Sequence, residues 1–149
     1  MTPIIFRAAS VGLILGLLSL AGAAGHAADL KFEAQLVWGT DDTKPPAGKN
    51  WKPVEPAIKN KIPLRWKNYF EVSRTNFVVK AGETKRQPMS EKCQLLVKNL
   101  DNSNVEVTLF GKGKEVMNRK QALPRGEILV LGGNAPNDTA WLVILRQAE

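Results

Sequence analysis

The sequence predicts an all-β domain, an antiparallel two-sheet sandwich that is immunoglobulin-like and has about seven strands. Three observations lead to this prediction. Apolar and polar residues alternate in several short runs, turn-forming residues separate these runs, and no stretch has the apolar spacing of a long amphipathic helix. A small closed β-barrel would give the same pattern and is the alternative fold.

The first predicted strand spans residues 30–38, where apolar side chains from Leu30 to Trp38 occupy every second position. This alternation is typical of a strand with one buried face. A long loop follows at residues 39–65, because residues 44–63 hold five of the nine prolines and proline cannot donate to a sheet. Within it, Pro56 is suited to the first turn of a helix of at most two turns.

The remaining strands are predicted from alternation and from the turns between them. Residues 66–80 form one extended strand bent at residues 74–76, or two strands. Further strands are expected at residues 84–89 (an edge strand containing Pro88), 94–100, 105–110, 115–120, 127–131 and 139–146. The last is apolar on both faces and is expected to be central, and Trp38 and Trp141 are expected in the core. The sequence from Leu123 to Gly126 resembles the sheet-crossing corner of many immunoglobulin-like sandwiches.

The N-terminal residues 1–27 are predicted to be a signal peptide, which leaves residues 28–149 as a single domain. Arg7 is the only charged residue before Asp29, residues 11–20 are apolar or small, and Gly25-His26-Ala27 fits a cleavage site. The alternative is an uncleaved membrane anchor. After cleavage we expect an exported protein, periplasmic or extracellular, with no stable membrane anchor.

Cleavage removes His26, the only histidine, and this excludes several chemistries. A chain without imidazole cannot build a Ser-His-Asp or Cys-His site, or place histidine on a metal. Cys93 is the single cysteine, so no intramolecular disulfide forms, and we expect it to be a buried, small apolar residue. Asp41 and Asp42 lack the spacing of a calcium loop, and we expect no metal and no cofactor.

The loop and the residues just after it combine cations with tryptophans, in a chain of formal net charge +7. Cations hold anions and aromatic rings stack on sugars, so this composition indicates binding of an anionic polymer. The candidate ligand-binding residues are Lys49, Trp51, Lys52, Lys59, Lys61, Arg65, Trp66 and Lys67. The expected partner is an envelope polysaccharide or an acidic protein, and nucleic acid is not expected for an exported protein. The alternative is a solvated loop whose tryptophans close over the sandwich.

Four runs of the sequence resemble a group of small exported bacterial proteins that have no assigned activity. They are KFEAQLVWGT at residues 31–40, WKNYFEV at residues 66–72, LFGKGK at residues 109–114 and NDTAW at residues 137–141. The resemblance implies a bacterial periplasm or cell surface, and it implies no catalytic residues.

The sequence therefore predicts a non-catalytic exported binding module for an anionic polymer or an acidic protein surface. The first alternative is a structural or assembly protein that pairs through a sheet edge. The second alternative is a carboxylate-based hydrolase, which needs two suitably spaced acids among residues such as Glu33, Asp41, Asp42, Glu71 and Glu127.

Overall fold

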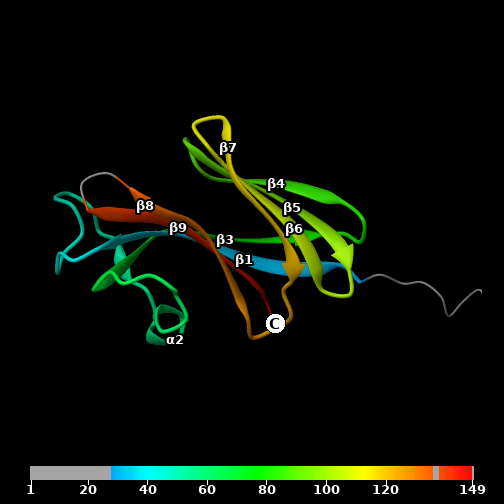
Figure 1. Cartoon of the computed structure of the whole chain (residues 1–149), viewed down its shortest axis with the longest axis horizontal. Helices are drawn as coiled ribbons and strands as arrows, with labels where there is room; N and C mark the ends of the chain where they lie inside the picture. The colour runs from blue at the N-terminus through cyan, green and yellow to red at the C-terminus, as the bar shows by residue number, and fades with distance from the viewer. Residues whose placement is uncertain (1–27, 136–137, 149) are drawn as a thin grey trace, which may run out of the picture.

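The computed structural model describes residues 28–135 and 138–148, so the predicted signal peptide lies outside the described residues. The described chain is a sandwich of two antiparallel sheets, which confirms the predicted fold, and it does not close into a barrel (Figure 1). The five-stranded sheet has the order β2-β3-β1-β9-β8, and the four-stranded sheet is the meander β4-β5-β6-β7. The strands are β1 (Leu30–Thr40), β2 (Lys52–Pro53), β3 (Asn68–Val79), β4 (Thr84–Ser90), β5 (Cys93–Asp101), β6 (Asn104–Gly111), β7 (Lys114–Ala122), β8 (Ile128–Ala135) and β9 (Thr139–Gln147).

Nine strands in the described residues exceed the predicted number of about seven. The two-residue β2 lies within the predicted loop, where no alternation marks it. β3 is one strand, and its pairing with β1 is regular through Arg74 and Thr75, so the alternative of two strands is wrong. The irregularity in that pairing lies instead between Leu36 and Val37. β8 also continues to Ala135, into a segment predicted as a turn.

Two of the three inner strands of the five-stranded sheet, β1 and β9, match their predictions. β1 pairs with β3 on one side and β9 on the other, which ties the start of the described chain into the sheet. β9 pairs with β1 and β8, and both of its faces are buried. The predicted edge strand β4 does lie at a sheet edge.

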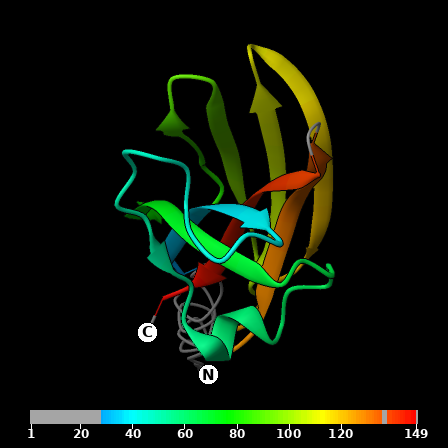
Figure 2. The ribbon, with the colours of Figure 1, turned by 90° about the vertical axis from the view of Figure 1, so that its left-hand side faces the viewer.

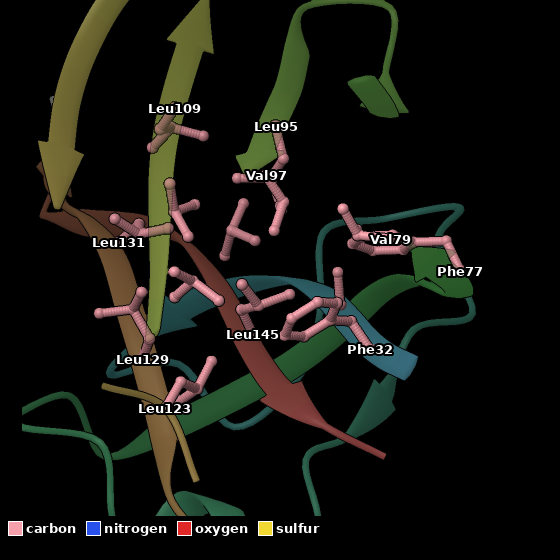
Figure 3. Packing of buried hydrophobic residues seen from close by; sticks show 14 of the residues in the cluster. Phe32, Phe77, Val79, Leu95, Val97, Leu109, Leu123, Leu129, Leu131 and Leu145 are labelled. Carbon is pink, nitrogen blue, oxygen red and sulfur yellow. The ribbon is translucent and has the colours of Figure 1, made fainter. Parts of the chain in front are cut away.

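The main core fills the space between the two sheets. Figure 3 shows side chains of both sheets pointing toward one another, with Leu95 and Val97 of β5 opposite Phe32 and Leu145. All four are fully buried. Apolar residues alternate along each strand here because only one face of the four-stranded sheet is covered.

A second apolar cluster covers part of the other face of the five-stranded sheet. We call it the outer cluster; it consists of Val37, Val54, Ile58, Ile62, Tyr69, Ala140, Leu142 and Ile144 with the partly buried Leu64, Trp66, Ile128 and Val130. The short helix α2 (Pro56–Lys59) contributes Ile58, and Pro56 stands in its first turn as predicted. Figure 2 shows α2 on the side of this sheet opposite the four-stranded sheet.

The two sheets are connected covalently at one end only, which we call the closed end. Residues 80–83 lead from β3 to β4, and residues 123–127 lead from β7 to β8, so the segment from Leu123 to Gly126 crosses between sheets as predicted. Each of these connections is held by one buried side-chain amide. Asn99 donates to the carbonyl of Val79 (3.1 Å), and Gln147 donates to the carbonyl of Leu123 (3.1 Å).

The opposite end, which we call the open end, carries hairpin turns and no connection between the sheets. In Figure 1 the β6–β7 hairpin rises away from β8 and β9 there, and Figure 2 looks toward this end. The turns between β4 and β5 and between β6 and β7 lie together, because the Lys112 amide donates to the Lys92 carbonyl at 2.8 Å.

Candidate functional site

The chain between β1 and β3 wraps around the edge of the five-stranded sheet. Its first part carries Trp51, which contacts Trp38 of β1 and Trp141 of β9. β2 then pairs with β3 at the sheet edge. The remainder, from Val54 to Trp66, packs in the outer cluster. The predicted loop is therefore ordered, and its tryptophans pack on the sheet. We call the chain between β1 and β3, residues 41–67, the cover.

This wrapping separates the candidate residues into two groups. Lys49 and Trp51 lie together, with the Lys49 Nζ 5.9 Å from the centre of the Trp51 ring. Trp66 lies on the other side of the sheet, where it belongs to the outer cluster and its Nε1 donates to Asn134 Oδ1 at 3.2 Å. The eight residues do not form one patch.

The other candidates are exposed residues of the cover: Lys52, Lys59, Lys61, Arg65 and Lys67. The Lys61 Nζ donates to the Gly126 carbonyl at 2.7 Å, so it ties the cover to the connection before β8. The Lys67 backbone amide donates to Asp41 Oδ1 at 3.0 Å, which fixes the two ends of the cover to each other. Asp41 therefore supports the backbone.

A cleft of about 1020 Å³ enters the molecule at the open end, between the two sheets. Its wall on the five-stranded sheet includes Leu36 and Trp38 of β1, Gly133 of β8, and Trp141 and Val143 of β9. Leu36 and Val143 also belong to the main core, so the cleft is the continuation of the space that the core fills further inside.

The facing wall belongs to the four-stranded sheet and combines small residues with larger ones such as Phe110. Cys93 of β5, Leu109 and Gly111 of β6 and Val116 of β7 line it. A Cβ atom at Gly111 would stand 3.1 Å from Val116 Cγ2, so the Val116 side chain covers the glycine. Val116 is 57 % exposed, the highest value among the large apolar residues of the described chain.

Three tryptophans meet at the mouth of the cleft. Trp38 and Trp141 are directly paired across β1 and β9, and Trp51 of the cover packs edge-on against both, with ring centroids 5.7 and 6.0 Å away. Phe70 of β3 continues the row on the far side of Trp38, at 6.1 Å. Trp38 is buried as predicted. Trp141 is 41 % exposed, so its predicted core position is wrong.

Cations lie around the mouth of the cleft. Lys92 and Lys112 line it from the hairpin turns of the four-stranded sheet, and Glu91 is the one acid among its lining residues. Lys49 stands over Trp51 on the other side. No ion pair of the described residues involves any of these three lysines, so their charges are available to a ligand.

Cys93 lines the cleft and also packs against the main core. It is half-buried, whereas the sequence analysis expected a buried residue. Burial raises the pKa of the thiol above its ordinary value, so at neutral pH it is protonated and a poor nucleophile.

Two of the acids considered for hydrolysis, Glu33 and Glu71, are held by arginines. Glu33 and Glu71 both contact the guanidinium of Arg74, and Glu33 also contacts that of Arg146 at 2.9 Å. Burial alone raises the pKa of Glu71, but the hydrogen bonds from Arg74 and Gln35 outweigh it and lower the pKa overall. A general acid needs a raised pKa. Within the described chain no group of three or more metal-ligating side chains gathers.

The sequence did not reveal the cleft, because alternation marks which face of a strand is covered but not where two sheets diverge. Its one local signal is the pair Gly132-Gly133 in a strand, since glycine in a strand often marks a place where another group approaches closely.

In the part of the chain that the structure describes, no helix is long and apolar enough to cross a bilayer. Comparison of the chain with protein-family models, curated proteins and solved structures finds no match.

Proposed function

We propose that this protein is a non-catalytic exported module that binds an anionic polymer of the cell envelope, and that binding takes place at the mouth of the open-end cleft. The observation that carries the proposal is the group formed by Lys49, Trp51 and Trp141. It offers an exposed indole beside a cation stacked on a second indole. Rings of this kind stack on sugars, and cations hold carboxylates or phosphates.

Export is part of the same proposal and rests on the signal-peptide features of residues 1–27. The lysines of the cover outside the cleft, such as Lys59, add long-range attraction for a polyanion. They are expected to influence the rate of association more than the bound state.

An acidic polysaccharide tests the proposal directly. Residues 28–149 should bind alginate and should not bind neutral dextran, as measured by isothermal titration calorimetry at low salt. Binding should weaken as salt is raised, because screening reduces contacts between exposed charges. Two single variants, Trp141→Ala and Lys49→Gln, should each weaken alginate binding at least tenfold.

The matched control exchanges Lys59, on α2, for Gln, which removes the same charge outside the cleft mouth and should change the affinity little. Equal binding of alginate and dextran, or equal losses from the Lys49 and Lys59 variants, would contradict the proposed site.

Assembly through a sheet edge is the second candidate, and β7 favours it. β7 is nine residues long, lies at the edge of the four-stranded sheet, and is exposed at every position except Met117. Its Lys and Arg side chains are typical of an edge kept from pairing, which places this candidate second. A partner that stays bound in high salt and is released by replacing Asn118 with Pro would support it, because main-chain pairing is insensitive to screening.

A further inference from the structure

We propose that the open-end cleft holds the acyl chain of an anionic amphiphile, with the anionic head group at the two adjacent turns that carry Lys92 and Lys112. This inference rests on the proposed function, and it identifies the envelope ligand as one with a lipid chain. A free fatty acid and the lipid end of an anionic glycan share this chemistry.

The interior of the cleft is suited to a hydrocarbon chain. Leu36, Trp38, Leu109, Val116 and Val143 line it, and none of these side chains offers a charge. A polymer of sugars would bury its hydroxyl groups against these residues without hydrogen bonds, which is unfavourable. An acyl chain has no polar group to satisfy. The volume of about 1020 Å³ stands at the upper end of the range of roughly 300–1,000 Å³ for small-ligand sites.

Space for the chain is present next to Trp141. Gly133 is paired with Trp141 across β8 and β9, and a Cβ atom at Gly133 would have no atom within 4 Å. Gly133 also has no positive φ, so a larger side chain would fit the backbone and extend into this space. An occupant reaching this point would lie against the indole of Trp141.

The charges at the mouth complement an anionic head group. Lys92 and Lys112 are brought together by the 2.8 Å hydrogen bond between their turns, and the Ser90 hydroxyl accepts the Lys92 amide at 3.2 Å. The head group would therefore meet two cations on a fixed backbone while the chain enters between the sheets. Glu91 disfavours an anionic head group only modestly, because it is outnumbered by the two lysines.

A chain-length series is the decisive experiment. Binding of octanoate, decanoate and dodecanoate to residues 28–149 is measured by calorimetry at pH 8, below their micelle concentrations. Burying one methylene contributes about 0.8 kcal/mol, so Kd should fall up to about fourfold per added carbon until the cleft is full. Each bound chain should also slow alkylation of Cys93, the single cysteine, because it lines the cleft. Kd values that do not depend on chain length would overturn the inference.

Two variants locate the site. Gly133→Leu fills the space beside Trp141 and should weaken dodecanoate binding at least tenfold, whereas Val78→Leu, on an exposed position of β3, should leave it unchanged. The double variant Lys92→Glu, Lys112→Glu should weaken dodecanoate binding but not 1-dodecanol binding. The double variant Lys80→Glu, Lys98→Glu carries the same charge change on exposed positions outside the cleft and serves as its control. Unaltered dodecanoate binding in Gly133→Leu, with the fold intact by circular dichroism, would overturn the inference.

The alginate measurement separates this inference from the proposed function. If alginate binds and dodecanoate does not, the polymer proposal stands and the acyl-chain inference fails. If dodecanoate binds with the expected chain-length dependence and alginate does not, the ligand is a free amphiphile and the polymer proposal fails.

Discussion

Gly132 and Trp141 are so close that a Cβ atom on the glycine would lie 2.3 Å from the Trp141 carbonyl oxygen. The next residue, Gly133, has open space at the same position, although it is the residue paired with Trp141. Two adjacent glycines therefore serve different purposes. The first allows the backbones of β8 and β9 to approach, and the second leaves the cleft open.

This difference predicts opposite effects of the same substitution. Gly132→Ala should destabilise the fold by about 2 kcal/mol or more, because its φ is +114° and its methyl group would meet backbone. Gly133→Ala should be neutral or slightly stabilising, because its backbone does not need glycine. Urea unfolding measures both, and equal destabilisation of the two variants would contradict this account of the strand.

The ion pairs on the outer side of β1 and β3 predict a pH-dependent contribution to stability. The pKa of Glu71 is lowered in the folded state below its ordinary value of 4.5. Its carboxylate therefore stabilises the fold fully above that value, and the stabilisation is lost as the pH falls through the lower folded pKa. Glu71→Gln should cost about 1 kcal/mol at pH 7, a figure kept small because the group is partly exposed.

The measurement compares thermal unfolding of Glu71→Gln and the wild type at pH 7 and at a series of lower pH values, because protonation of Glu71 removes the charge difference between them. The gap between them should shrink at the lower pH values. Glu115→Gln, at an exposed position of β7, is the control and should show no such change.

Trp51 anchors the first part of the cover to the five-stranded sheet. Replacing it with Ala removes the ring that joins Trp38 to Trp141, and should cost about 1–3 kcal/mol, less than a fully buried tryptophan. The chain around Lys49 loses its anchor, so trypsin should cleave after Lys49 several times faster. Cleavage after Lys59 provides an internal control, because α2 is held by the outer cluster instead. Equal acceleration at both sites would mean that the cover is a single cooperative unit.

Loss of the buried Gln147 amide at the closed end should lower the free energy of unfolding. Gln147 is 8 % exposed, and its Nε2 donates to the Leu123 carbonyl and to the Ser103 hydroxyl at 3.4 Å. Gln147→Met keeps the shape but leaves the Leu123 carbonyl without this donor, at a cost of about 1–3 kcal/mol. Gln121→Met, at an exposed position of β7, should change the free energy of unfolding by less than about 0.5 kcal/mol.

Most of the fold follows from the sequence, because alternation is a local property and the turns between strands use characteristic residues. β1 was predictable from the spacing of Leu30, Phe32 and Ala34, and the central position of β9 from its two apolar faces. β2 was not predictable, since two residues cannot show a period. The cover was predicted as a loop, and its alternative role of closing over the sandwich is the one the contacts of Trp51 and Trp66 support.

The candidate site was harder to predict, since it depends on distance between sheets. Lys49 and Trp51 were identified from composition, and they lie at the cleft mouth. Trp141 was assigned to the core, since its strand gives no sign that the facing residues are as small as Gly111 and Cys93. That information belongs to pairs of residues on different sheets, and a single sequence does not reveal which residues face each other.

The position of the two sheet-crossing connections has a consequence for how this protein can change. Because both crossings lie at the closed end, each hairpin turn at the open end joins strands of a single sheet. Insertions or exchanges in the turns around Lys92 and Lys112 would alter specificity without altering the chain path between the layers. The molecule thus separates the part that must remain constant to fold from the part that is free to diversify, which makes the open end a natural place to graft new recognition loops.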